Sequence, residues 1–471
     1  MKKLLSGLEP KKVFEVFEEI CAIPHGSGNT KAISDYCAGF ARERGLWVLQ
    51  DELNNVIIKK PASAGYENHP PVVLQGHLDM VCEKDPEIDF DFTRDALRLK
   101  LDGDILSATG TTLGGDDGVA VAIALGIIDD DTLLHPPLEV IFTSDEETGM
   151  YGAAGIDAAN ITAKRFISLD HGDDSSFTVG CAGGTRVEIE LPLETAAAVK
   201  PAYRISVSGL TGGHSGEEID KGRLNANKLL GSFLSAVPGD VRICGVSGGN
   251  MVNAITVNAS CVVCTGEDLT AAAKIFEKEN RCSADKGLTV TVDPVHCDTA
   301  FTAESSKLII NLLCELPDGV QAMSADFTGV VETSLNIGVI KIENNAFHVF
   351  ALLRSSKDNK KAELTEKIKK ISERFGARCD IKSEYPAWEY KKDSPLRKTM
   401  VSVYEDMFGK TPDTVIIHGG LECGLFSGKI KDIDAVSTGP NLYDIHTAHE
   451  SLSVSSLARI YKYICRVLEA L

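Results

Sequence analysis

The 471-residue sequence has no long hydrophobic run, because no window approaches the ~18 consecutive apolar residues that a membrane-spanning helix needs. It has no excess of basic residues either, since its formal net charge is −20. This charge argues against non-specific binding to nucleic acid, which depends on basic patches. The sequence also has no internal repeat and no low-complexity segment. These absences predict a globular protein with no membrane or nucleic-acid partner. The length of the chain suggests two or three domains.

A regular cysteine pattern is missing as well. The thirteen cysteines are spread along the chain without the spacing of a disulfide framework, which favours reduced thiols. Cys261 and Cys264 have CxxC spacing, but no second pair stands at the distance of a zinc ribbon. Their segment has the pattern of a strand, where residues three apart point to opposite faces, so we predict structural roles for both.

The N-terminus has basic residues but no long apolar stretch after them. Met1 to Leu8 begins like the basic part of a signal peptide, and Glu9 to Lys12 then interrupt it. We therefore expect no secretory signal and a cytoplasmic location.

Helix and strand patterns alternate in the first 180 residues. Such alternation is typical of an α/β fold with a mostly parallel sheet covered by helices. The predicted helices lie at 11–22, 29–44 and 118–128, and the predicted strands at 72–74, 138–143 and 165–169.

The centre of the chain has the pattern of an α+β domain. Half-buried strands are predicted at 187–191, 203–208, 254–258 and 346–353, between amphipathic helices at 222–236, 269–279, 304–315 and 361–375. The α/β pattern then returns with a helix at 395–408, a strand at 414–417 and a helix at 453–471. We therefore predict a catalytic domain formed by residues 1–184 and 391–471, with a lid domain of residues 185–390 inserted between them.

Polar side chains that can bind metal follow successive strands of the predicted sheet. Open α/β sheets bind ligands at the carboxyl ends of their strands. The residues at these ends, and in two further turns, are His77, Asp79, Asp116, Asp117, Glu146, Glu147, Asp170 and His446. Imidazole and carboxylate ligands without thiolates suit zinc, with cobalt or manganese as alternatives.

Each of these residues has a simpler explanation when it is taken alone. A single acidic residue after a strand usually caps a helix or forms a turn. Successive strand ends and turns that all carry suitable residues are difficult to explain in this way. We therefore predict a catalytic metal site from the group rather than from any single member.

The motifs resemble those of a known enzyme family. His77-Leu-Asp79, Leu113–Gly118, Asp145–Gly149, Leu169-Asp170 and His446–Glu450 are similar to motifs of the co-catalytic zinc family of aminoacylases, carboxypeptidases and dipeptidases. Four further segments resemble the bacterial aminoacyl-histidine (Xaa-His) dipeptidases within that family: Ile23–Gly28, Ser208–Gly216, Asn225–Leu229 and His418–Gly424. One departure is His449, where the family commonly has aspartate at a position that is not a ligand.

The resemblance implies a role for each residue of the site. Asp116 would bridge two zinc ions, and His77 and Asp170 would complete the coordination of one of them. Glu147 and His446 would complete the coordination of the other ion. The catalytic residues would be Glu146, as the general base acting on a metal-bridging hydroxide, and Asp79, as the residue that orients His77.

The lid would supply further residues. The resemblance implies that His214 stabilises the tetrahedral oxyanion and that Asn253 lies near the substrate. Arg354 has the fork-shaped group that suits a substrate carboxylate, although a structural salt bridge explains it equally well. His418 and Glu422 are candidates for contact with the free amine of the substrate.

The first functional hypothesis is metal-dependent hydrolysis of dipeptides of the Xaa-His type, including β-alanyl-histidine. A deacylase of N-acyl amino acids or a tripeptidase on the same metal core is the second. A non-catalytic dimerising module is the third, and the complete set of metal ligands argues against it. Edge strands in the lid make a homodimer compatible with the sequence, and His214 could then serve its own site or that of a neighbouring subunit.

Overall fold

The structure is a computed structural model that describes residues 4–198 and 201–471. The chain forms two compact units. The first comprises Met1–Gly180, Tyr390–Val415 and Leu425–Leu471, and the second comprises Cys181–Glu389 and Ile416–Gly424. Among the described residues, no helix combines the length and apolar character that crossing a membrane requires.

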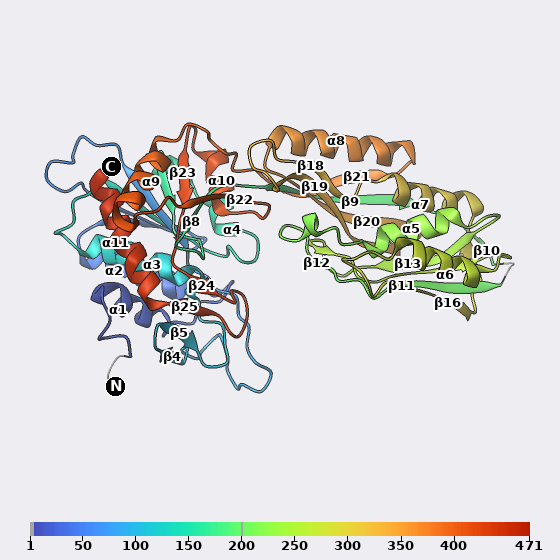
Figure 1. Cartoon of the computed structure of the whole chain (residues 1–471), viewed down its shortest axis with the longest axis horizontal. Helices are drawn as coiled ribbons and strands as arrows, with labels where there is room; N and C mark the ends of the chain where they lie inside the picture. The colour runs from blue at the N-terminus through green and yellow to red at the C-terminus, as the bar shows by residue number, and fades with distance from the viewer. Residues whose placement is uncertain (1–3, 199–200) are drawn as a thin grey trace. The chain divides into compact units, whose positions relative to one another are not determined.

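The first unit is built on an eight-stranded sheet (Figure 1). Its strands in sheet order are β1 (Trp47–Gln50), β2 (Val56–Lys60), β6 (Leu138–Thr143), β3 (Val72–His77), β7 (Arg165–Ser168), β23 (Asp434–Ser437), β8 (Ser176–Cys181) and β22 (Asp413–Ile417). The central strands β6, β3, β7 and β23 run parallel, whereas β1, β2 and β8 pair antiparallel with their neighbours. The predicted α/β fold with a parallel centre is confirmed.

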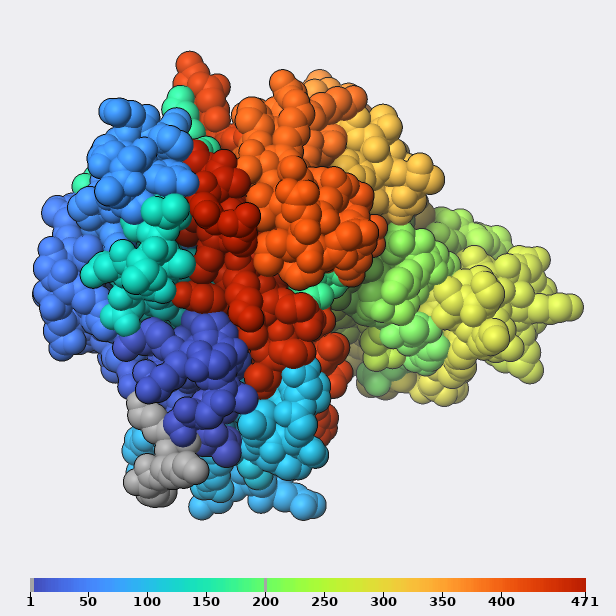
Figure 2. All heavy atoms as spheres, turned by 60° about the vertical axis from the view of Figure 1, so that its left-hand side comes forward, coloured from blue at the N-terminus to red at the C-terminus, as the bar shows by residue number. Residues whose placement is uncertain are grey.

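Helices surround this sheet, and a small second sheet accompanies it. The helices are α1 (Lys11–Ile20), α2 (Lys31–Glu43), α3 (Gly115–Asp129), α4 (Tyr151–Gly155), α9 (Pro395–Phe408), α10 (Glu422–Lys429) and α11 (Val454–Ala470). The small sheet has the order β24 (Leu442–Tyr443), β25 (Ser451–Ser453), β5 (Ile105–Ala108) and β4 (Leu99–Asp102). The N-terminal α1 and the C-terminal α11 lie side by side, as the dark blue and red segments of Figure 2 show.

The centre of the first unit depends on the close packing of α3 against β3. All six residues of β3 are buried, and α3 is apolar around almost its whole circumference, as expected of a helix covered on all sides. A Cβ atom on Gly76 of β3 would lie 2.3 Å from the Cβ of Ala120 and 2.5 Å from Oδ2 of Asp117. Glycine is therefore required here so that the N-terminus of α3 can approach the end of the strand.

The second unit is built on a nine-stranded antiparallel sheet. Its order is β16 (Thr289–Val295), β11 (Ala202–Ser208), β15 (Ala259–Cys264), β13 (Arg242–Gly248), β19 (Val331–Glu343), β20 (Ala346–Ser355), β9 (Gly183–Pro192) and β21 (Arg378–Tyr385), with β18 (Gly319–Met323) also paired to β19. The core of this unit joins the sheet to α5 (Ala226–Ala236), α6 (Leu269–Asn280), α7 (Ala303–Glu315) and α8 (Asp358–Arg374). Two short pairs, β10 (Thr195–Ala197) with β17 (Thr299–Phe301) and β12 (Gly213–His214) with β14 (Ala254–Ile255), complete it. The predicted α+β character is confirmed.

The strand predicted at 254–258 is wrong in its extent. Only Ala254–Ile255 form a strand, β14, and the strand that joins the large sheet begins at Ala259. Thr256 lies between them, and its hydroxyl donates to the backbone oxygens of Ile337, at 3.2 Å, and Gly338, at 2.7 Å. This side-chain bonding to the backbone interrupts the strand.

The CxxC pair lies on a strand, as predicted, with its two side chains in different clusters. Cys261 belongs to the main core of the second unit, whereas Cys264 belongs to a separate small cluster with Ala202 and Ala300. The two thiols therefore point to opposite faces of β15 and cannot ligate one metal ion together.

The segment Asn225–Leu229, which carries part of the family resemblance, has a structural role. The side chain of Asn225 caps α5 by accepting from the backbone N–H of Asn227, and its amide nitrogen donates to the Ile337 carbonyl at 3.0 Å. Asn227 also donates to Ile337, at 3.0 Å. The two asparagines thus attach α5 to β19.

Asp318 completes this attachment, and we expect it to make stability depend on pH. Its Oδ1 accepts from Ile337 N at 3.0 Å and Asn225 Nδ2 at 3.2 Å, while burial raises the pKa of this carboxyl to about 6. The folded chain thus holds the proton more tightly than the unfolded chain, whose aspartate pKa is about 3.9. Stability is therefore lost as the pH rises from about 4 to above 6, by up to about 3 kcal/mol.

Asp318→Asn removes this titration but keeps an oxygen for both hydrogen bonds. We expect the thermal midpoint of the wild type to fall relative to that of Asp318→Asn between pH 4.5 and pH 7. Because titrations at other sites affect both proteins equally, the difference between their midpoints is the quantity to measure. A difference that stays constant over this range would contradict the prediction.

Candidate metal centre

The predicted metal ligands of the first unit come from separate segments that end at the same edge of its sheet. His77 is the last residue of β3, Asp116 lies in the first turn of α3, and Asp170 follows β7. Glu147 follows β6, and His446 lies in the loop between β24 and β25. The structure therefore brings together all five residues that the sequence predicts as ligands.

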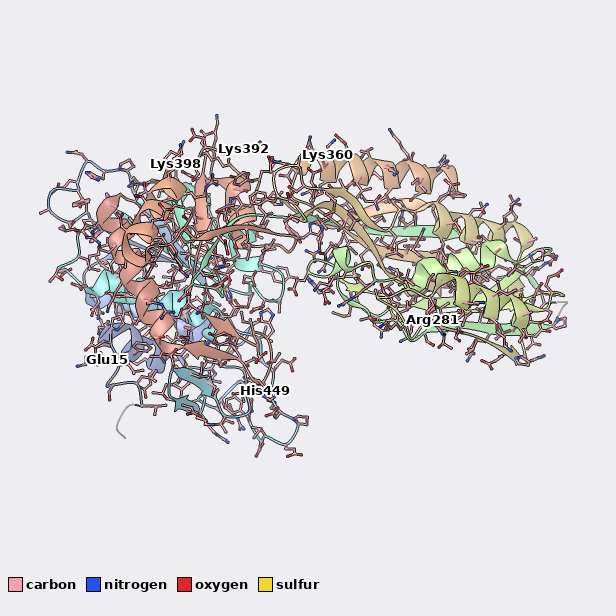
Figure 3. All side chains as sticks on the ribbon, viewed as in Figure 1. Glu15, Arg281, Lys360, Lys392, Lys398 and His449 are labelled. Atoms are coloured by element: carbon pink, nitrogen blue, oxygen red, sulfur yellow. The ribbon has the colours of Figure 1, made fainter. Side chains whose placement is uncertain are left out.

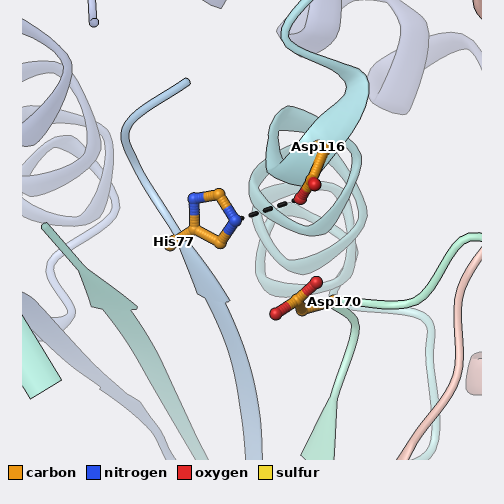
Figure 4. Close-up of side chains that lie close together, drawn as sticks. All are labelled: His77, Asp116 and Asp170. Carbon is orange, nitrogen blue, oxygen red and sulfur yellow. Dashed lines mark hydrogen bonds and ion pairs between the residues drawn. The ribbon is translucent and has the colours of Figure 1, made fainter. Parts of the chain in front are cut away.

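His77, Asp116 and Asp170 form one group whose potential ligand atoms all lie within 4.8 Å of one another (Figure 4). Nε2 of His77 lies 3.0 Å from Oδ1 of Asp116. His77 is almost fully buried, with 1% of its surface exposed, so its imidazole is held rigidly at this position.

Asp116, Glu147 and His446 form a second group of the same kind. Nε2 of His446 lies 3.3 Å from Oδ2 of Asp116 and 2.9 Å from Oε1 of Glu147. The two oxygens of Asp116 therefore face different histidines, Oδ1 toward His77 and Oδ2 toward His446. This is the arrangement expected of a carboxylate shared between two cations.

The electrostatics of the two groups fit divalent cations. Burial and the charge of Asp116 raise the pKa of Asp170 to about 7, because carboxylates at this distance disfavour one another's ionisation. Hydrogen bonds to Asp116 and Glu147 raise the pKa of His446 to about 10. Both shifts show that the site favours added positive charge, and nitrogen and oxygen donors of this kind suit zinc, cobalt or manganese.

Glu146 lies within a third group, with His77 and Glu147. It is adjacent to Glu147 in sequence and half-buried. Geometry alone thus allows Glu146 to be either a metal ligand or a base beside a bound metal ion.

Asp79 supports the segment that carries both glutamates. Its Oδ1 accepts from the backbone N–H of Glu146 at 2.9 Å, and its Oδ2 accepts from that of Glu147 at 3.2 Å and from Ser27 Oγ at 2.8 Å. Nδ1 of His77 lies 3.0 Å from the Asp79 carbonyl and 3.5 Å from its carboxylate. Burial opposes ionisation of Asp79, but the hydrogen bond to His77 and those from Ser27 and Glu146 hold its pKa below the usual range. The sequence predicts the link to His77 but not the two bonds to the glutamate backbone.

Asp117 supports the end of β3. Its Oδ2 accepts from the backbone N–H of His77 at 3.2 Å, and it is 1% exposed. Burial, together with the charges of Asp170 and Asp116, raises its pKa well above the usual value. Asp117 therefore acts through hydrogen bonding to the backbone that carries His77.

Glu450 holds the loop that presents Asp116. Its Oε2 accepts from the backbone N–H groups of Leu113 at 2.7 Å and Gly114 at 3.0 Å, and its Oε1 accepts from those of Gly115 at 2.8 Å and Asp116 at 3.1 Å. Glu450 is 3% exposed. One buried carboxylate thus binds four consecutive N–H groups at the start of α3, a position that favours negative charge. Sequence reasoning missed this role, and its only sequence signal is that Glu450 ends the His446 motif.

His449 lies outside these groups. It is exposed, and Figure 3 shows it at the surface of the first unit. None of the candidate metal groups among the described residues includes it. The departure from the family pattern at this position therefore leaves the proposed ligand set intact.

The second unit contains a cluster around Arg354, near the end of β20. One terminal nitrogen of Arg354 donates to Tyr385 Oη at 3.2 Å, and the other lies 3.5 Å from Nε2 of His214. Arg354 is 5% exposed. Within the described residues its Nε has no hydrogen-bond partner and no carboxylate pairs with it. A buried, unneutralised guanidinium is costly unless an anion binds it.

The surroundings of the two histidines near Arg354 favour their neutral forms. Burial, and then the charge of Arg354, lowers the pKa of His418 to about 3 and lowers that of His214 in the same direction. Nε2 of His418 lies 2.8 Å from Ser334 Oγ. Arg354 is thus the main source of positive charge in this cluster, which we call the Arg354 cluster (His214, Ser334, Arg354, Tyr385 and His418).

Asn253 and Glu422 are the remaining residues that the sequence predicts as substrate contacts. Asn253 lies beside His214, because its backbone oxygen accepts from Ser215 N at 2.8 Å and β12 pairs with β14 next to it. Glu422 is 1% exposed and begins α10, four residues after His418. Tyr385, which the sequence did not single out, contacts Arg354 directly.

Two histidines and three carboxylates that meet at the strand ends of an α/β sheet form a donor set typical of metal-dependent hydrolases. The chain belongs to the family described as Peptidase family M20/M25/M40, which matches residues 73–470. It is therefore a metallopeptidase.

Comparison with individual proteins agrees with this assignment. The chain is 36% identical over 477 residues to the cytosol non-specific dipeptidase of Escherichia coli (strain K12), covering 99% of this chain and 98% of that protein. It matches the crystal structure of aminoacylhistidine dipeptidase from Vibrio alginolyticus with a TM-score of 0.91 and 34% identity, over 100% of this chain and 98% of that one. The aminopeptidase PepT of Bacillus cereus shares the fold, with a TM-score of 0.59, 16% identity and coverage of 98% and 99%.

Proposed function

We propose that the chain is a cytoplasmic dipeptidase that requires two divalent metal ions, most suitably zinc, and that its substrates include Xaa-His dipeptides such as β-alanyl-histidine. The proposal of two metal ions rests on the placement of Asp116, whose two oxygens face His77 and His446. The similarity to two full-length dipeptidases supports the substrate class.

The proposed roles divide the five ligands between two ions. His77 and Asp170 hold one ion, Glu147 and His446 hold the other, and Asp116 is shared. When bound, the ions supply positive charge that polarises the scissile carbonyl and lowers the pKa of water. Glu146 accepts a proton from the attacking water and donates it to the leaving amine. Asp79 holds the backbone of Glu146 and Glu147, so the base and one ligand keep a fixed spacing.

We propose that the Arg354 cluster recognises the substrate, with Arg354 binding its C-terminal carboxylate. The support is the buried guanidinium that lacks a carboxylate partner among the described residues. His214, held neutral beside it, is proposed to donate a hydrogen bond to the developing oxyanion. Asn253, His418 and Glu422 are proposed as further substrate contacts, the last two on the free amine.

A substrate screen tests the proposed activity. The purified chain is loaded with zinc, manganese or cobalt in turn and assayed on dipeptides including β-alanyl-histidine, on a tripeptide and on an N-acetyl amino acid. We expect the highest kcat/KM on dipeptides, with Xaa-His among the best. Faster hydrolysis of the N-acetyl amino acid or the tripeptide would replace the proposal with a deacylase or tripeptidase on the same centre.

Arg354→Lys tests carboxylate recognition. Hydrogen bonds to a charged group contribute about 1.5–3 kcal/mol, so we expect kcat/KM for a dipeptide to fall about 10- to 150-fold. The fall should be much smaller for the same dipeptide with a C-terminal amide. Arg378→Lys, at an exposed arginine of β21, is the matched control and should leave both substrates unaffected. An equal loss on the acid and the amide would exclude this role.

We propose that the chain forms a homodimer through its second unit. The sheet order ends at β16 and β21, and both of these strands carry features that discourage strand addition. β16 contains Pro294, and β21 contains the charged residues Arg378, Asp380 and Lys382. We therefore propose that dimerisation does not use strand addition at β16 or β21. Lys382→Glu reverses a charge on β21. If this variant sediments as a dimer, the result would support the proposal, and if it sediments as a monomer, the result would refute it.

A further inference from the structure

Three cysteines that are distant in sequence meet in the second unit, outside the Arg354 cluster. Sγ of Cys244 lies 3.4 Å from Sγ of Cys264, and Cys297 interacts with the same Cys244 thiol. All three belong to one small cluster with Ala202 and Ala300. We call Cys244, Cys264 and Cys297 the thiol cluster.

The backbone explains why the first two sulfurs touch. β13 and β15 are antiparallel neighbours in which Arg242 pairs with Cys264, and the register shifts between Ile243 and Gly245. Cys244 is the extra residue of this bulge, which redirects its side chain toward Cys264 on the neighbouring strand. The two thiols thus lie in van der Waals contact, and a shift of little more than 1 Å brings them to the S–S bond length of ~2.05 Å.

Exposure differs within the thiol cluster. Cys264 is buried, whereas Cys244 and Cys297 are half-exposed. The thiol of Cys297 donates to the Thr299 carbonyl at 2.9 Å, in the segment that leads into β17. Burial and the two neighbouring thiols raise the pKa of Cys244, so at neutral pH this thiol is a weak nucleophile toward external reagents. Attack from solvent therefore begins at Cys297, and Cys244 reacts afterwards with the sulfur beside it.

We propose that the thiol cluster is a redox modification site that takes up a small-molecule disulfide and stores the oxidation as a Cys244–Cys264 disulfide. The Cys297 thiolate first attacks the small disulfide, forms a mixed disulfide and releases one small thiol. Cys244 then attacks the Cys297 sulfur, forms the Cys244–Cys297 bond and releases the second small thiol. Cys264 finally attacks the Cys244 sulfur and returns Cys297 as a thiol. Two protein thiols are oxidised and one small disulfide is reduced to two thiols.

The test treats the zinc-loaded full-length protein with oxidised glutathione, blocks the remaining thiols by alkylation and maps the bonds by mass spectrometry. Cleavage at Met251 separates Cys244 from Cys264, so a bond between them joins two fragments. We expect two of the thirteen thiols to be lost and a Cys244–Cys264 link to form. A glutathione adduct on Cys297 with Cys244 and Cys264 still alkylated, or no modification of the thiol cluster, would overturn the proposal.

Three variants separate the steps. Cys264→Ser should stop the sequence at a Cys244–Cys297 link, and Cys297→Ser should slow formation of the Cys244–Cys264 link at least tenfold. Cys244→Ser should leave only a glutathione adduct on Cys297. Cys314→Ser, at an exposed cysteine in the same unit, is the matched control and should change nothing. If Cys297→Ser forms the Cys244–Cys264 link as fast as Cys314→Ser does, the small disulfide is attacked directly by Cys244. The proposed role of Cys297 would then be wrong.

Discussion

Glu146→Gln is expected to bind metal as tightly as the wild type while losing about 10²- to 10⁴-fold in kcat, the range that general acid–base catalysis contributes. Glutamine keeps the size and hydrogen-bonding geometry of the side chain but cannot accept and return a proton. The loss should appear in kcat and much less in KM, because Glu146 is proposed to act on the proton and not on substrate binding.

Glu147→Gln is the matched comparison, since the two residues are neighbours and their N–H groups bind the same carboxylate of Asp79. Its side chain lies 2.9 Å from His446, within a candidate metal group. We expect this variant to lose more metal affinity than the about 10- to 100-fold that loss of a residue supporting a ligand costs, with activity partly restored by excess zinc. Equal loss of metal in both variants would make Glu146 a ligand, which the third candidate group also allows, and would remove it as the base.

Glu450→Gln is expected to lower metal affinity although Glu450 is not a proposed ligand. Its carboxylate accepts four backbone N–H groups, and glutamine would turn an NH₂ group toward two of them. Each buried donor left unsatisfied costs about 1–3 kcal/mol. The loop that presents Asp116 should therefore shift, and zinc affinity should fall about 10- to 100-fold, as for other residues that support metal ligands.

Two readouts separate this positioning role from a general loss of stability. Isothermal titration with zinc measures the affinity, and the thermal midpoint of the metal-free protein measures the folding effect. Both should fall in Glu450→Gln. The exposed neighbour His449, changed to alanine, should alter neither. An unchanged zinc affinity in Glu450→Gln would show that Asp116 holds its position without this carboxylate.

Local patterns in the sequence were sufficient to predict the central strands β3, β6 and β7 of the first unit and the edge where the candidate metal ligands meet. β6 was predicted with its observed bounds, and β3 and β7 within a few residues, because short apolar runs that end in glycine or polar residues mark buried strands. Convergence of His77, Glu147 and Asp170 then follows from the topology, since the parallel strands β3, β6 and β7 end at one edge.

The contacts that support the ligands could not be predicted in the same way. Glu450 binds the loop at Leu113 more than 300 residues away, and no local pattern marks a glutamate that accepts backbone N–H groups. The carboxylate of Asp79 binds the backbone of Glu146, again through a distant contact. Likewise, nothing in the pattern of β21 indicates that Tyr385 contacts Arg354. Roles that depend on tertiary contacts to backbone groups leave little trace in composition or spacing.

The central claim is that Asp116 is shared by two metal ions, and metal stoichiometry tests it most directly. Elemental analysis of the protein, after equilibration with zinc and removal of free metal, should find two ions per wild-type chain. Asp170→Asn, which affects a ligand of one ion only, should retain one ion, whereas Asp116→Asn should retain neither. One ion per wild-type chain, or as much zinc in Asp116→Asn as in Asp170→Asn, would contradict the shared carboxylate.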